Sequence, residues 1–147
     1  MKKLIKGIFV MSVTLLVTTA QAQEKAITIT EMPQAAQEFV KKYYDVKSVS
    51  HVILEDELFS RKEYKVVLTD GTDLEFDSKG QWTEVDAQRQ AVPAEIIPQK
   101  IRNYVSQSFP NNKIVQISRS SRKYEVELTS GLNLDFNAKG EFIRIDD

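Results

Sequence analysis

Carboxylates are the side chains of this sequence with the widest range of possible chemistry. Most of them lie in segments where apolar and polar residues alternate: Glu55, Asp56, Glu57, Glu63, Asp73, Glu75, Asp77, Glu84, Asp135, Asp146 and Asp147. Carboxylate oxygens bind calcium, and a pair of carboxyl groups can act as general acid and base. Acids that alternate along a strand also form an ordinary solvated face.

The run Asp73–Asp77 resembles the start of an EF-hand calcium loop, with Glu84 eleven residues after its first aspartate. The pattern fails at two positions, because Ser78 stands where the loop requires glycine and Glu75 stands where Asp or Asn is usual. The apolar residues inside the run alternate as in a strand. We therefore predict no metal site and no cofactor, and interpret these acids as a solvated strand face.

Other residue types used in catalysis are scarce. The sequence has no cysteine and a single histidine, His51. A metal site needs three or four ligands, and one histidine without a nucleophile beside it makes no catalytic pair. The sequence has no glycine-rich phosphate loop either. We predict that the protein is not an enzyme.

The first 22 residues have the features of a secretory signal peptide. Three lysines precede the apolar run Ile8–Val17, and an Ala-x-Ala cleavage pattern ends at Ala22. The run is shorter than the ~20 residues that a membrane-spanning helix needs. We predict a periplasmic or secreted protein whose mature chain, 23–147, is not inserted into the membrane.

The charge of the mature chain limits its partners. Three of the 20 basic residues and none of the 21 acidic residues lie in 1–22, so the rest of the chain has a net charge of −4. Mild acidity without a basic cluster argues against nucleic acid as a partner. Residues 23–147 are enough for one domain.

A segment of 25 residues occurs twice, at 62–86 and 122–146, with ten identical positions. Most of these are apolar or turn residues, which determine architecture more than chemistry. They are Tyr64/Tyr124, Val66/Val126, Leu68/Leu128, Thr69/Thr129, Gly71/Gly131, Leu74/Leu134, Phe76/Phe136, Lys79/Lys139, Gly80/Gly140 and Asp86/Asp146.

The elements before and within the two copies follow the same order. Helical spacing and a leading proline predict helices in Pro33–Tyr44 and Glu95–Phe109, the second starting at Pro98. Alternation predicts eight strands: Ser48–Glu55, Tyr64–Leu68, Asp73–Asp77, Trp82–Asp86, Lys113–Arg119, Tyr124–Leu128, Leu132–Phe136 and Phe142–Ile145. Glu24–Glu31 fits either a short edge strand or an extended lead-in.

The predicted fold is α+β, with two tandem α-β-β-β-β units at about 31–87 and 93–147 in one domain. Two such units join most economically into one eight-stranded antiparallel sheet with both helices on one face. The other face is then open to solvent or to a partner.

The two closing strands carry the candidate binding site. Strict alternation places Trp82, Glu84, Phe142 and Arg144 on the open face. Exposed aromatic and charged residues together are typical of a protein-binding surface. The alternative is that the two aromatic rings lie across neighbouring side chains or against the N-terminal segment.

The paired motifs Tyr64–Gly71 with Leu74–Gly80, and Tyr124–Gly131 with Leu134–Gly140, resemble the PepSY-like family of exported bacterial proteins. That family is described as similar to the β-lactamase-inhibitor-protein fold. The resemblance covers nearly all of Pro33–Asp147. It implies an exported binding module without known catalytic residues or an established partner.

Three functions follow as hypotheses. The first is a non-enzymatic exported binding module that engages a protein or peptide through the open face of its sheet. The resemblance to the PepSY modules of protease propeptides suggests a second, an inhibitor or regulator of an exported peptidase. The third is an ion or small-molecule sensor that uses the acidic strand.

Overall fold

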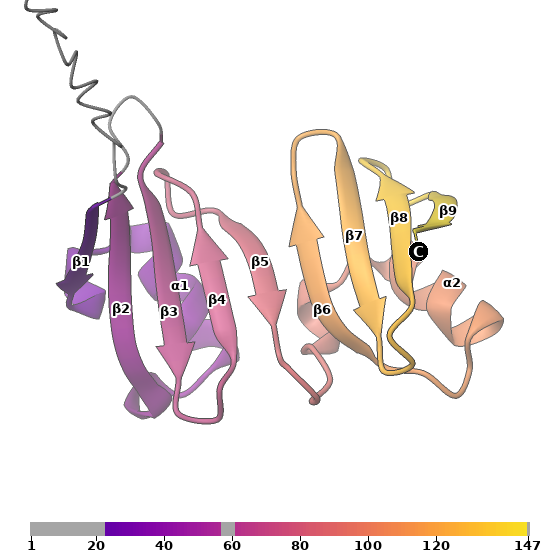
Figure 1. Cartoon of the computed structure of the whole chain (residues 1–147), viewed down its shortest axis with the longest axis horizontal. Coiled ribbons are helices and arrows are strands. Elements are labelled where there is room, and N and C mark those ends of the chain that lie inside the picture. The colour runs from indigo at the N-terminus through magenta and orange to yellow at the C-terminus, as the bar shows by residue number, and fades with distance from the viewer. Residues whose placement is uncertain (1–22, 57–60, 147) are drawn as a thin grey trace, which may run out of the picture.

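The computed structural model describes residues 23–56 and 61–146, so the predicted signal peptide at 1–22 lies outside the described residues. They form one antiparallel sheet whose nine strands lie side by side in chain order (Figure 1). The strands are β1 (Gln23–Ile27), β2 (Val49–Asp56), β3 (Glu63–Leu68), β4 (Asp73–Phe76), β5 (Trp82–Asp86), β6 (Ile114–Arg119), β7 (Lys123–Leu128), β8 (Asn133–Asn137) and β9 (Phe142–Asp146).

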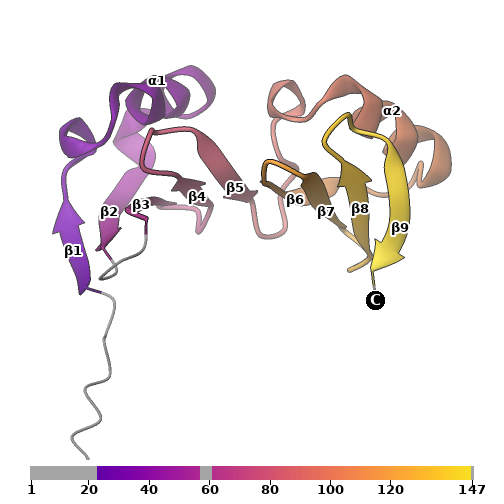
Figure 2. The same ribbon diagram turned by 90° about the horizontal axis from the view of Figure 1, so that it is seen from above.

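Two α-helices, α1 (Gln34–Tyr43) and α2 (Gln99–Ser108), lie on the same side of the sheet (Figure 2). Three short 3₁₀ helices accompany them: η1 (Ile29–Glu31), η2 (Val46–Ser48) and η3 (Ala94–Ile96). In the part of the chain that the structure describes, no helix has the length and apolar character needed to span a membrane. The predicted α+β class, the antiparallel sheet and its helix-covered face are confirmed.

Each helix begins where the sequence predicts. Pro33 and Pro98 cap the two helices with φ of −53° and −52°, values that proline holds without strain. On each helix, small and branched apolar residues three or four positions apart face the sheet. Ala36 and Val40 of α1, and the corresponding residues of α2, are fully or almost fully buried there.

A row of apolar residues crosses the helix-covered face from one edge of the sheet to the other. Cross-strand pairing links its members in order: Ile27, Val52, Val66, Leu74, Val85, Ile117, Val126, Leu134 and Ile145. Most are buried, since the helices pack over the row. The exceptions are the two ends of the row: Ile27 on the first strand is half-buried, and Ile145 on the last strand is exposed.

The turn between β4 and β5 contacts the start of α1 through a glycine. Gly80 has φ of +81°, a conformation that other residues rarely adopt. A Cβ atom at this position would lie 2.8 Å from Cβ of Pro33 and 2.9 Å from the backbone nitrogen of Ala36. The turn therefore needs glycine both for its backbone angle and for the close approach of the helix.

The predicted count of eight strands is wrong, because the segment before α1 contributes a ninth. All five residues of β1 pair with β2. The strand then ends where the backbone N–H of Thr28 donates to Glu31 Oε2 at 2.7 Å, which turns the chain into η1. The other elements match the predicted ranges closely: α1 is followed by β2–β5, and α2 is followed by β6–β9.

Candidate binding face

The face of the sheet opposite the helices carries the polar side chains of the strands. Cross-strand pairing aligns one row along it: Ala26, Ile53, Lys65, Glu75, Glu84, Ser118, Glu125, Asp135 and Arg144. Among the described residues no helix lies on this side (Figure 2). We call this surface the open face.

The open face is strongly acidic. Register and alternation place eleven acidic side chains on it: Glu24, Glu55, Glu63, Asp73, Glu75, Glu84, Asp86, Glu125, Glu127, Asp135 and Asp146. The strands place three basic side chains on this face: Lys65, Lys123 and Arg144. The acids greatly outnumber the bases, so the negative potential is concentrated on this side of the molecule.

Two glutamates of the open face lie directly opposite each other at the centre of the sheet. Glu75 of β4 pairs with Glu84 of β5, and both side chains are half-buried. Burial raises the pKa of both carboxyl groups, and repulsion from Glu84 raises the pKa of Glu75 further. A hydrogen bond from the amide of Gln116 to Glu84 partly offsets this effect on Glu84. The pair is thus a site of unfavourable charge in the free protein.

The neighbouring strand supplies one compensating cation. Nζ of Lys65 lies 3.1 Å from Oδ2 of Asp73, and both side chains are mostly covered. The hydrogen bond to Asp73 raises the pKa of Lys65 despite its partial burial, and Glu75 and Glu55 add to the rise. The positive charge of Lys65 therefore stabilises several carboxylates in this half of the open face.

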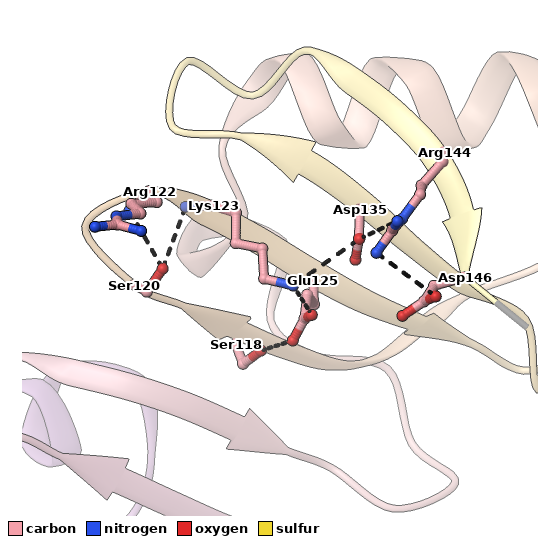
Figure 3. Close-up of polar contacts among 8 residues, drawn as sticks. All are labelled: Ser118, Ser120, Arg122, Lys123, Glu125, Asp135, Arg144 and Asp146. Atoms are coloured by element: carbon pink, nitrogen blue, oxygen red, sulfur yellow. Dashed lines mark hydrogen bonds and ion pairs between the residues drawn. The ribbon is translucent and has the colours of Figure 1, made fainter.

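The other half of the open face holds a network of ion pairs around Asp135 (Figure 3). Arg144 Nε donates to Asp135 Oδ2 at 3.0 Å, and Lys123 Nζ lies 3.9 Å from the same oxygen. Lys123 also pairs with Glu125, and Arg144 with Asp146 at 3.8 Å. Asp135 is 4% exposed, so the two cations balance a buried negative charge.

Three carboxylates of this network converge. Glu125, Asp135 and Asp146 each offer an oxygen, and the three oxygens lie within 4.8 Å of one another. They line a hollow of about 150 Å³ that Ser118 and Asn133 also border. Oxygen ligands of this type suit a hard divalent cation, which would have to compete with the two basic side chains already present.

The structure separates the four predicted site residues into two pairs. Glu84 and Arg144 lie on the open face, as predicted. The predicted placement of Trp82 and Phe142 there is wrong, because both rings lie on the helix side. The ring of Phe142 stacks on Tyr104 of α2, with centroids 4.4 Å apart and planes 12° apart.

A β-bulge in each closing strand explains the difference. Glu75 and Phe76 are adjacent on β4, but their partners on β5, Glu84 and Trp82, are two positions apart. The strand β5 therefore contains one extra residue at this point. The same irregularity occurs between β8 and β9. The extra residue shifts the alternation by one position, which turns the aromatic residue toward the helix.

Trp82 borders a separate hollow on the molecule. The strands β5 and β6 pair at three positions and diverge beyond them, and a cleft of about 530 Å³ lies there. The guanidinium carbon of Arg119 lies 4.1 Å from the centroid of the Trp82 ring, and its Nε donates to the Trp82 carbonyl at 2.7 Å. Arg119 thus replaces a backbone hydrogen bond where the strands separate.

Several residues of the open face did not emerge from the sequence as candidates. Glu125 and Glu127 alternate with apolar residues along β7 and face the same side as Lys123. Extending the alternation from β4 to β7 would have identified them. The convergence of Glu125 with Asp146 depends on pairing across β8, which no local pattern reveals.

Comparisons with known proteins agree with this fold. The model of a family described as "Putative beta-lactamase-inhibitor-like, PepSY-like" matches residues 62–144. A solved structure of a "putative calcium-regulated periplasmic protein" from Bacteroides thetaiotaomicron is 39% identical, with a TM-score of 0.81 over 84% of this chain and 97% of that one. A periplasmic protein of the DUF2874 family from Bacteroides vulgatus is 35% identical, with a TM-score of 0.79 over 85% and 98%. The comparison with curated proteins finds no match.

Proposed function

The chain belongs to the beta-lactamase-inhibitor-like, PepSY-like family, and on this basis we propose that it is a non-enzymatic binding module of the periplasm. It engages a protein or peptide through the open face of its sheet. The similar structures from Bacteroides are described as periplasmic proteins, which supports the location. The predicted signal peptide at 1–22 supports it as well.

The observation that carries the proposal is the excess of acid on the open face. This broad surface carries eleven acidic side chains and three basic ones, and no described helix covers it. A surface of one sign attracts partners of the opposite sign and orients them during encounter. The partner that fits is therefore a protein or peptide segment rich in Lys and Arg.

The pair Glu75 and Glu84 strengthens this inference. Each carboxyl group has a raised pKa in the free protein, with burial as the main cause. Such groups cost folding stability, and proteins commonly retain costs of this kind at functional surfaces. A basic side chain of a partner placed between Glu75 and Glu84 would relieve their repulsion.

An affinity purification with paired variants tests the proposal. The bait is the protein itself, applied to an envelope extract of the bacterium that produces it. The variant E75K/E84K reverses two charges on the open face, and the control E38K/E95K reverses two exposed charges elsewhere. Both variants change the net charge equally, so the comparison isolates position from total charge.

We expect wild type and the control to retain the same partner. The open-face variant should retain at least about tenfold less of this partner, because each lost contact with a basic group costs on the order of 1 kcal/mol. Equal retention by both variants would contradict the proposal. A peptidase as the captured partner would select the regulator hypothesis among the possible roles.

A calcium-responsive role is a second candidate. Its support is the convergence of Glu125, Asp135 and Asp146, together with a relative described as calcium-regulated. Calcium takes six to eight oxygen ligands, so three carboxylates need help from neighbouring polar groups and water. Binding would also require Lys123 and Arg144 to release their acidic partners.

Titration calorimetry with calcium chloride tests this role. We expect heat of binding and a higher thermal midpoint for the wild type, and neither for D135N. Magnesium should bind more weakly, since it demands a smaller octahedral site. The absence of heat with the wild type would remove the calcium candidate and leave the protein-binding proposal intact.

A further inference from the structure

The two edges of the sheet differ in the number of large apolar side chains that they expose. At one edge, β1 presents mostly exposed polar and charged side chains, including Glu24 and Lys25. At the other edge, β9 carries the exposed charged residues Arg144 and Asp146 and, beside them, three exposed apolar ones. Phe142 is 36% exposed, Ile143 55% and Ile145 45%. Charged side chains normally protect an edge strand from pairing with other chains. The β9 edge has one side of its backbone unpaired within the described residues, and its charged residues alternate with exposed apolar ones.

The molecule contains an internal comparison for this edge. The strand β5 pairs with β4 as β9 pairs with β8: Val85 lies opposite Leu74, and Ile145 lies opposite Leu134. Both strands carry a bulge at the same place. Yet Val85 is completely buried, whereas Ile145 is 45% exposed.

The two strands also differ in what lies on their outer side. On the outer side of β5, β6 adds antiparallel and places Ile117 opposite Val85. It also places Ser118 opposite Glu84 and Gln116 opposite Asp86. The outer side of β9 has no such neighbour among the described residues. The chain thus shows which kind of strand completes an edge of this geometry.

We propose that the outer edge of β9 accepts an extended segment of a partner protein as a tenth, antiparallel strand. The segment resembles β6 in pattern. It has a branched apolar residue opposite Ile145 and polar residues opposite Arg144 and Asp146, and it has no proline in the paired stretch. Backbone hydrogen bonds supply affinity in this mode of recognition, and the alternating side chains supply selectivity. The site lies along the edge of the sheet and borders the open face at Arg144 and Asp146.

A peptide copied from β6 is the probe for this edge. The fluorescently labelled sequence KIVQISRS, residues 113–120, is titrated with the purified protein and followed by anisotropy. Hydrogen exchange then locates the bound peptide. We expect saturable binding, with new amide protection in β9, and no binding of a scrambled peptide of the same composition.

Two single substitutions to lysine provide the matched comparison. I145K adds a charge to the β9 edge, and A26K adds the same charge to the β1 edge. Both residues are exposed, and circular dichroism checks that each variant folds. I145K should weaken peptide binding by about tenfold or more, since a charge opposes burial of the apolar residue. A26K should leave it unchanged.

Three results would overturn the proposal. The first is no binding of the β6 peptide at concentrations up to about 1 mM, the weak end of specific association. The second is equal binding by I145K and wild type. The third is protection located in β5 or β1, which would mean that the peptide displaces an internal strand. A dimer that forms without peptide and is lost in I145K would identify a second copy as the occupant and refute the partner strand.

Discussion

The glutamate pair at the centre of the open face makes an unusual prediction: E75Q should stabilise the protein. Glu75 lies directly opposite Glu84 across two strands, and burial together with repulsion from Glu84 raises its pKa above the ordinary 4.5. Replacing the carboxylate with a neutral amide of the same shape removes the repulsion. It also removes part of the attraction to Lys65, which is the smaller contribution.

The expected size follows from cross-strand energetics. Opposed side chains on adjacent strands interact by about 0.2–1 kcal/mol, and like charges destabilise by that amount. We expect E75Q to raise the free energy of unfolding by about 0.5 kcal/mol at pH 7, a rise of about 2 °C in thermal midpoint. The control D73N lies two residues away on the same strand. It breaks the 3.1 Å ion pair with Lys65 but also removes the repulsion from Asp86, which lies opposite, so it should not raise stability as E75Q does.

The pH dependence gives a sharper test. Above its raised native pKa, Glu75 is charged in the folded protein, and the wild type bears the full cost. As the pH falls through that pKa and below 4.5, the wild-type group takes up a proton and the cost disappears. The advantage of E75Q should therefore be complete at pH 7 and absent near pH 4. Thermal melts of the wild type, E75Q and D73N across this range measure it. An E75Q protein less stable than wild type at pH 7 would refute the reasoning.

Three further predictions concern packing and the ion-pair network. G80A should cost about 2–4 kcal/mol and G131A about 1 kcal/mol, because both have positive φ but only the first places a Cβ against α1; equal losses in thermal melts would count against the close contact. A double-mutant cycle of Y104A and F142A should give a coupling of about 0.5–1.5 kcal/mol for the stacked rings. Zero coupling would contradict the contact between Phe142 and Tyr104 on the helix side. R144A should destabilise by about 2 kcal/mol by removing the closest cation from a buried carboxylate, and an unchanged denaturant midpoint would show that the pair contributes nothing.

The sequence predicted most of the fold because its signals are local. Alternation, helical spacing and the prolines at the helix starts marked both helices and eight strands to within a few residues. The strand β1 was ambiguous because most of its side chains are exposed, so burial leaves little pattern in it. Its strand conformation comes from pairing with β2, which is a tertiary effect.

The candidate site was predicted only in part, for a physical reason. Period-two alternation assigns faces correctly until a bulge inserts a residue, and the bulges precede Glu84 and Arg144 in the closing strands. Counting outward from Val85 therefore gave the right face for Glu84 and the wrong one for Trp82. The acidic character of the open face depends on strands brought together by the sheet, so no single segment displays it.

Carboxyl-group footprinting of a captured complex tests the central claim most directly. A carbodiimide label, read out by mass spectrometry, modifies solvent-accessible carboxyl groups, including half-buried ones, in the free protein and in the complex. We predict that Glu75, Glu84 and Glu125 lose reactivity in the complex, while Glu38 and Glu95 keep theirs. Unchanged labelling of all three open-face glutamates, with protection elsewhere, would contradict the assignment of this face as the binding surface.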